Sequence, residues 1–153
     1  MDKSNRKSET RFENNWFFKT LEILEKEYWE EIPDDATYLV TTCHQLRKKQ
    51  LNEFDTEDLR ILIGQNIGLK FLIPLALKTL DDNILAEGHF YKGDLLKMVL
   101  TSDTNYWSIE KDLWAKMCDL FKSRRTEIEK EAANHNTGRN ILKAYKEFEK
   151  INA

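Results

Sequence analysis

The chain has 153 residues with a formal net charge of −3, and it is 41% hydrophobic and 33% charged, which is the balance of a soluble globular protein. A chain of this length buries about 68–70% of its unfolded surface, so it can form one core without disulfides. The net charge gives no sign of a general polyanion-binding protein. The two cysteines, Cys43 and Cys118, lie outside any CxxC spacing and indicate reduced core thiols in a cytosolic protein.

The N-terminal residues are polar and contain no hydrophobic segment of the kind found in secretory signals. We therefore expect a flexible leader over residues 1–15 and a single helical domain over residues 16–153. Glycine and proline together account for seven residues, and no alternating strand pattern persists. The sequence thus predicts an all-α fold, a single compact bundle of about six to seven helices.

The first two predicted helices flank a proline. Apolar residues recur at three- and four-residue steps from Trp16 to Tyr28 and predict an amphipathic helix that ends near Glu31. After Pro33, residues 34–35 are expected to cap a second helix. Five residues of that helix share one face and are predicted to be buried: Ala36, Leu39, Val40, Cys43 and Leu46.

Residues 54–80 are the most apolar stretch of the chain. Polar and charged residues interrupt it at Arg60, Gln65, Asn66, Lys70 and Lys78, so it fails as a membrane span, which needs about 20 predominantly apolar residues. It also lacks the GK[ST] of a phosphate-binding loop. We predict a third helix that begins at Asp55 or Thr56, a tight turn at GQNIG, and a central buried helix over residues 69–80.

Residues 81–94 form the one long irregular stretch, with turn residues at both ends. A fifth helix is expected directly after Asp94. Hydrophobic spacing predicts a sixth helix over residues 106–128 and a last helix over residues 141–148, capped at 136–137.

The loop before the fifth helix carries Glu87, His89, Tyr91 and Asp94, which is the one polar cluster that resembles a site. A glutamate, a histidine and an aspartate can bind a metal or perform acid–base chemistry, which would suit a small metal-dependent enzyme. However, HExxH and other strong ligand spacings are missing. Turn and helix-cap chemistry is the favoured interpretation of these residues.

Two basic runs, RKK at 47–49 and KSRR at 122–125, could contact nucleic acid, as in a helical nucleic-acid-associated regulator. Both runs are short, and solvated helix faces explain them more simply. Acidic residues are concentrated elsewhere: residues 20–42 hold seven acids against one lysine, and residues 81–94 hold four acids against one lysine. These acids either complement helix dipoles and aid solubility, or steer a basic partner; both alternatives stay open.

Four sequence blocks occur in order between Leu21 and Trp107: LEILEKEYW, CHQLRKKQL, EDLRILIGQNIGLKFLIPLAL and AEGHFYKGDLL. Their combination resembles the immunity proteins of bacterial contact-dependent growth inhibition (CDI) systems. Three positions depart from that family's pattern. Gln50 and Lys92 stand where it has proline, and His89 stands where it has aspartate.

The resemblance implies a small cytoplasmic protein that has no catalytic activity, cofactor or metal. It implies that the partner is the C-terminal domain of the cognate toxin, in many such systems a nuclease, whereas neither nucleic acid nor a membrane is expected as a partner. Both a monomer and a homodimer stay open. Acidic, histidine and tyrosine side chains are the expected toxin contacts: Asp81, Asp82, Glu87, His89, Tyr91 and Asp94, followed by Asp34 and Asp35.

Overall fold

The computed structural model describes residues 16–153, which form nine α-helices, one short 3₁₀ helix and no strand longer than an isolated bridge. The all-α prediction is therefore confirmed, and seven of these helices have seven or more residues. The chain divides into two compact units, an N-terminal unit that ends at Asp55 and a C-terminal unit, Thr56–Ala153. The leader predicted for residues 1–15 lies outside the described range, and the single domain over 16–153 stays a prediction.

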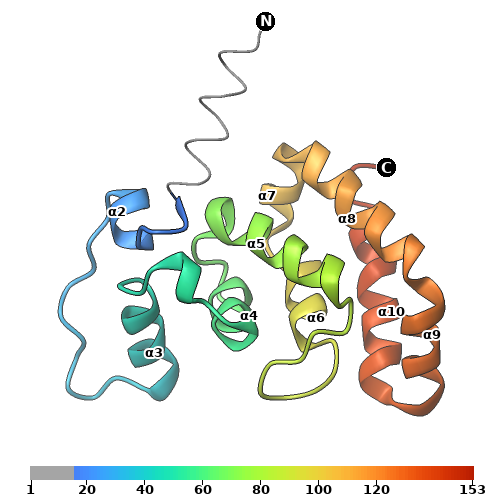
Figure 1. Cartoon of the computed structure of the whole chain (residues 1–153), viewed down its shortest axis with the longest axis horizontal. Coiled ribbons are helices and arrows are strands. Elements are labelled where there is room, and N and C mark those ends of the chain that lie inside the picture. The colour runs from blue at the N-terminus through green and yellow to red at the C-terminus, as the bar shows by residue number, and fades with distance from the viewer. Residues whose placement is uncertain (1–15) are drawn as a thin grey trace, which may run out of the picture. The chain divides into compact units, whose positions relative to one another are not determined.

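The N-terminal unit contains α2 (Leu21–Glu25), α3 (Tyr38–Leu46) and the 3₁₀ helix η1 (Leu51–Glu53) (Figure 1). The predicted long first helix is wrong, because α2 has only five residues. It ends where Lys26 adopts a left-handed conformation (φ 55°) and donates its N–H to the carbonyls of α2. The residues that follow contact α3 instead of continuing the helix.

The second helix begins later than its predicted caps. The side chain of Thr37, not Asp34 or Asp35, caps α3 by accepting a hydrogen bond from the Val40 N–H at 3.2 Å. Of the predicted buried face, Cys43 and Leu46 are buried. The prediction is wrong for Leu39 and Val40, which are exposed, because only the C-terminal half of α3 packs into the core.

The C-terminal unit is built around α6. Its helices are α4 (Thr56–Gly64), α5 (Leu69–Asp82), α6 (Asp94–Leu100), α7 (Thr104–Ile109), α8 (Lys111–Ser123), α9 (Arg125–Asn134) and α10 (Asn136–Glu149). Helix α6 packs against α4, α5 and α10 (Figure 1). Its hydrophobic residues Leu95, Leu96, Val99 and Leu100 are all buried, so this short helix forms the centre of the core.

The predicted helix starts and the turn within residues 54–80 are confirmed. Helices α4 and α5 begin at Thr56 and Leu69, and the turn between them uses left-handed conformations at Asn66 (φ 58°) and Gly68 (φ 67°). Half of the residues from Leu69 to Leu80 are buried, so α5 packs one face into the core, and the central position predicted for it belongs to α6. Within residues 16–153, no helix is both long and apolar enough to cross a membrane.

The predicted sixth helix is wrong, because residues 106–128 belong to three helices with breaks at Glu110 and Arg124. Arg124 donates hydrogen bonds to the backbone carbonyl and the carboxylate of Asp81, at 2.8 and 3.0 Å. These bonds tie the second break to the end of α5. The last helix is longer than predicted, and its N-cap is His135, without a side-chain cap from residues 136–137.

Helices α9 and α10 form a tight hairpin, since a single residue separates them. A Cβ atom on Gly138 would lie 2.5 Å from the backbone nitrogen of Ala132, so the two helices meet closely enough to require glycine. At Gly64, at the end of α4, the nearest atom belongs to a side chain and not to the backbone. A Cβ there would lie 2.9 Å from the sulfur of the flexible Met98 side chain.

We predict that Gly138→Ala lowers the free energy of unfolding by about 1–3 kcal/mol, because the backbone of Ala132 cannot move aside cheaply. Gly64→Ala is the matched control. It should change stability by no more than about 1 kcal/mol, because Met98 can change rotamer and alanine favours helix. Urea denaturation measures both variants, and equal losses would contradict the close approach of α9 and α10.

Candidate functional site

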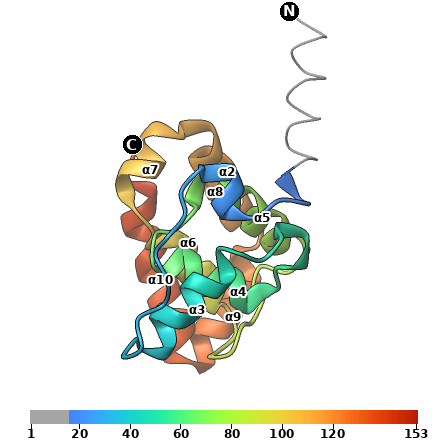
Figure 2. The same ribbon diagram turned by 90° about the vertical axis from the view of Figure 1, so that its left-hand side faces the viewer.

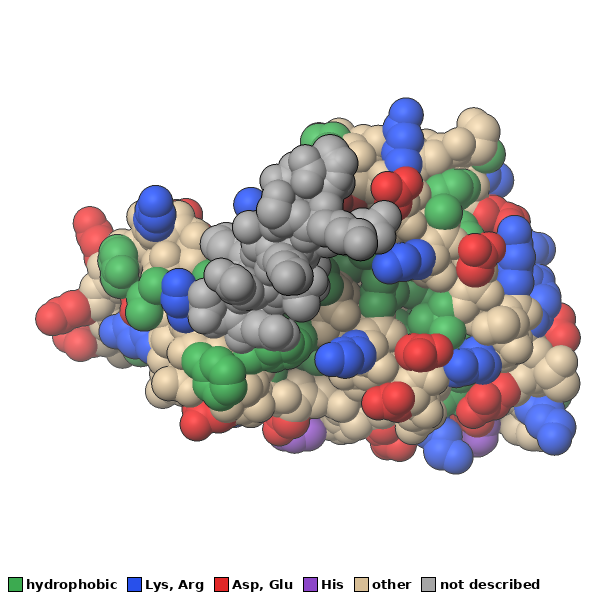
Figure 3. Space-filling view, turned by 45° about the horizontal axis from the view of Figure 1, so that its top comes forward, with side chains coloured by type: hydrophobic (Ala, Val, Ile, Leu, Met, Phe, Trp, Pro, Cys, Tyr) green, Lys and Arg blue, Asp and Glu red, His purple; other side chains and the backbone are tan. Residues whose placement is uncertain are grey.

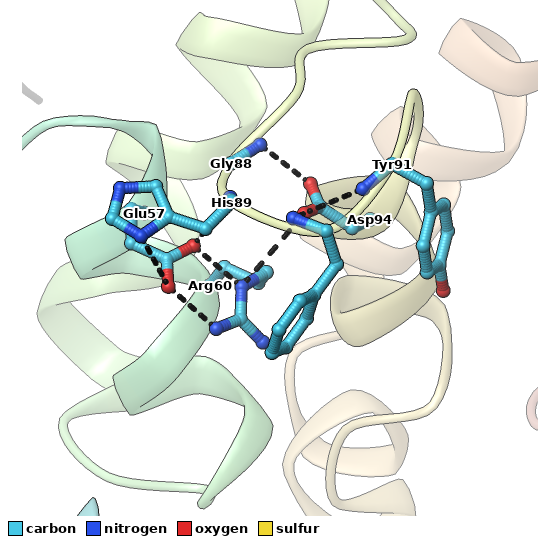
Figure 4. A network of polar contacts seen from close by, with 7 residues as sticks. Glu57, Arg60, Gly88, His89, Tyr91 and Asp94 are labelled. Atoms are coloured by element: carbon cyan, nitrogen blue, oxygen red, sulfur yellow. Dashed lines mark hydrogen bonds and ion pairs between the residues drawn. The ribbon is translucent and has the colours of Figure 1, made fainter. Parts of the chain in front are cut away.

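The segment between α5 and α6 folds back on itself. An isolated antiparallel bridge pairs Glu87 with Lys92, and the Gly93 N–H donates to the carbonyl of Leu85 at 3.2 Å. Residues 87–93 therefore form a compact loop, which we call the tip loop. Its conformation depends on three charged side chains, two from α4 and one from the first residue of α6 (Figure 4).

The carboxylate of Asp94 organises the backbone of the tip loop. Its Oδ1 accepts a hydrogen bond from the Gly88 N–H at 2.7 Å, and its Oδ2 accepts from Phe90 at 3.0 Å and Tyr91 at 3.4 Å. Asp94 is 1% exposed and lies in the first turn of α6, where the helix dipole favours a negative charge. The buried carboxylate thus satisfies loop amides that no strand or helix satisfies.

Glu57 and Arg60 of α4 complete the network. The Arg60 Nε and Nη2 donate to the two carboxylate oxygens of Glu57, each at 2.6 Å, and Arg60 Nε lies 3.8 Å from Asp94 Oδ2. Glu57 Oε1 also accepts the backbone N–H of His89 at 2.9 Å. One guanidinium therefore lies between two carboxylates that both bind the tip loop (Figure 4).

The network favours the charged forms of Glu57 and Arg60. The hydrogen bonds from Arg60 lower the pKa of Glu57 from its ordinary value of 4.5, against the opposing effect of burial. In turn, the hydrogen bond with Glu57 and the nearby charge of Asp94 raise the pKa of Arg60. Glu57 and Arg60 are therefore an ion pair at neutral pH.

Two glycines allow the tip loop to lie close to the charged network below it. A Cβ on Gly88 would lie 2.5 Å from Oε1 of Glu57, inside the space of the network. Gly93 has a left-handed φ of 88°, which favours glycine. The motifs EDLR and AEGHFYKGD thus meet in space, because the first supplies Glu57 and Arg60 and the second supplies Gly88, Gly93 and Asp94.

The tip loop displays an aromatic side chain outward. Phe90 is 70% exposed, and its ring rests on the Arg60 guanidinium, 4.1 Å from the ring centroid. Phe90 is not among the contact residues predicted from the sequence. The available signal was a large aromatic residue placed among polar loop residues. His89 is also 70% exposed, with Nδ1 3.5 Å from Glu57 Oε2.

The structure brings some of the predicted contact residues together and separates others. Glu87 and His89 are exposed on the tip loop, and Tyr91 is half-buried. Asp94 differs from expectation, because its buried carboxylate shapes the loop and does not reach the surface. This arrangement is turn chemistry, because Asp94 accepts hydrogen bonds from amides of the loop that precedes it, while the N-cap of α6 is Gly93 and has no side-chain cap. Within residues 16–153, no group of three or more His, Cys, Asp or Glu side chains could hold a metal ion.

The remaining predicted residues lie elsewhere. Asp81 and Asp82 are exposed at the end of α5, where Asp81 pairs with Arg124 at 3.0 Å. Asp34 and Asp35 are exposed in the N-terminal unit.

The basic runs are partly engaged within the chain. Arg47 is buried and bound to Glu25, while Arg124 and Arg125 pair with Asp81 and Glu129. Several of the cations that suggested nucleic-acid contacts therefore have intramolecular acidic partners.

These features define a helical scaffold with a surface loop whose amides bind two buried carboxylates. The family model for CDI immunity proteins matches residues 23–117, a span that includes α4, the tip loop and α6. The chain belongs to this family, whose members neutralise toxins and are generally not enzymes. Comparisons with curated proteins and with solved structures found no match.

We predict that Glu57→Gln lowers the free energy of unfolding by about 1–3 kcal/mol at neutral pH, because it removes a charged acceptor from Arg60 and His89. Since the pKa of Glu57 is lower in the folded chain than in the unfolded one, its contribution is fully present above the unfolded value of 4.5. The contribution is lost as the pH falls through the folded-state pKa. The difference in free energy of unfolding between wild type and Glu57→Gln should therefore shrink as the pH falls.

Urea denaturation at a series of pH values measures this difference. Glu129→Gln is the control, because its pair with Arg125 is exposed and should contribute less than about 1 kcal/mol. A Glu57→Gln effect that stays constant as the pH falls well below 4.5 would contradict the ionic network.

Proposed function

We propose that this chain binds the nuclease domain at the C-terminus of its cognate CDI toxin, one to one, in the cytoplasm of the producing cell. The tip loop is the contact surface and blocks the toxin. The observation that supports this most strongly is the exposed Phe90, held on a loop whose amides are fixed by buried Asp94 and Glu57.

A fixed loop lowers the entropy lost on binding. The amides of Gly88, His89 and Phe90 each have a carboxylate acceptor before any partner arrives. A loop in its bound conformation avoids the ordering cost that a mobile loop would incur. Phe90 then acts as an aromatic anchor, the type of residue that dominates many interfaces.

Exposed carboxylates in the segment from the end of α5 to the tip loop support a nuclease as the target. Asp82 and Glu87 are exposed, as is Asp81, which pairs with Arg124. A nuclease binds a polyanion and therefore presents a basic surface. Carboxylates opposite that surface would complement its charge and favour this class of partner over others.

We predict that calorimetric titration of this chain against the toxin domain gives a one-to-one complex of nanomolar affinity. Phe90→Ala should weaken binding by about 30-fold or more, the effect of losing a central anchor of about 2 kcal/mol. Ile109→Ala is the control, because Ile109 is also an exposed apolar residue, 77% accessible, but lies at the end of α7. The control should change affinity less than about twofold.

Two results would contradict this proposal. An absence of binding at micromolar concentrations would reject the neutralising complex. Equal affinities of the Phe90→Ala and Ile109→Ala variants would reject the tip loop as the contact surface.

A further inference from the structure

The N-terminal unit carries a strongly acidic segment that is not part of the tip loop. Residues 27–35, which we call the acidic arm, contain five acids and no lysine or arginine. All five acidic side chains are exposed, and the arm runs without helix between α2 and α3 (Figure 2). It is therefore a continuous negative stretch with no compensating base of its own.

Contacts from α3 and the residue that caps it hold the first part of the acidic arm. Arg47 is 2% exposed and donates to the carboxylate of Glu25 and the carbonyl of Glu27. Its guanidinium lies over the ring of Trp29, 4.6 Å from the centroid, and the same ring meets His44 edge-on at 4.8 Å. A buried guanidinium with these partners fixes the direction in which the arm leaves α2.

Exposed apolar side chains flank the acidic arm. Tyr28 lies on the arm, and Tyr38, Leu39 and Val40 form the first turn of α3, which begins three residues after the arm ends. All four are between 40% and 77% exposed. On the N-terminal unit, at the left of Figure 3, carboxylates project beside hydrophobic side chains. Apolar residues that stay exposed together next to charged ones are typical of an interaction surface.

Net charge is divided unequally between the two units. Residues 16–55 contain nine acids and five bases, a net charge of −4, whereas residues 56–153 contain fifteen of each. The negative charge of the described chain therefore belongs to the N-terminal unit. Five uncompensated carboxylates on the arm repel nucleic acid and anionic membranes, and they attract a protein surface rich in lysine and arginine.

We propose that the acidic arm, with Tyr28 and residues 38–40, is a second docking surface for the toxin domain. The part of the toxin domain that docks on this surface is basic, with lysine or arginine side chains around an apolar centre. This inference rests on the proposed function, since the occupant is the same toxin domain. The exposed carboxylates steer the encounter, and the apolar residues are covered once the complex forms.

The two surfaces predict different kinetic effects. Exposed charges at the edge of an interface act mainly on the association rate and its dependence on salt. A desolvated anchor such as Phe90 acts mainly on dissociation. Measuring both rate constants therefore separates the acidic arm from the tip loop.

The test variant neutralises four exposed acids of the acidic arm: Glu30→Gln, Glu31→Gln, Asp34→Asn and Asp35→Asn. The control variant changes net charge equally at four exposed acids of the C-terminal unit: Asp112→Asn, Asp119→Asn, Glu127→Gln and Glu149→Gln. Binding of the toxin domain to each full-length variant is followed by surface plasmon resonance at low and high salt.

We predict that the arm variant associates about tenfold more slowly than wild type at low salt, with a reduced salt dependence and a nearly unchanged dissociation rate. The control variant should associate within about twofold of wild type, because its charges lie outside the arm. Equal association rates for the two variants would overturn the inference.

Further outcomes separate this inference from the proposed function. If wild type fails to bind the toxin domain, the proposed function fails and the inference falls with it. If wild type binds and Phe90→Ala weakens binding, while arm and control variants behave alike, only the inference fails. If sedimentation shows a wild-type dimer that the arm variant dissociates, the occupant is a second copy, which also overturns it.

Discussion

The site depends on one buried arrangement of charge, in which Arg60 lies beside Glu57 and near Asp94. An almost fully buried carboxylate such as Asp94 would cost several kcal/mol if it lost its partners. It has three loop amides and a nearby guanidinium instead. Because each charge needs the others, the tip loop has one strongly preferred conformation, and α4, α6 and the loop are specified together.

This constraint supports our proposal that a loop without regular structure serves as the contact surface. The network lies below the surface, while Phe90 and His89 remain exposed above it. In our proposals the tip loop supplies the anchor and the acidic arm supplies the charge that brings the toxin domain to it. The arm has its own support in Arg47, a residue of the same unit.

Sequence predicted the elements whose signals are local. Gly68 and the apolar residues around it signalled the turn between α4 and α5. Asp94 was expected to cap α6, but the N-cap is Gly93. The prediction of a long first helix was wrong because Arg47, about 20 residues away, binds the segment after α2. The break at Arg124 carries no glycine or proline, and its contact with Asp81 spans 43 residues. Likewise, Glu57 and Arg60 formed part of a motif, but their contact with a loop some 30 residues later needed the structure.

The most direct test of the network is amide hydrogen exchange, measured by NMR, in the free wild-type protein. Our account predicts that the amides of Gly88, His89 and Phe90, each hydrogen-bonded to a buried or half-buried carboxylate, exchange far more slowly than those of an unstructured peptide. Exchange at the rate of an unstructured peptide would show that Asp94 and Glu57 do not hold the tip loop. The loop would then be no preformed contact surface.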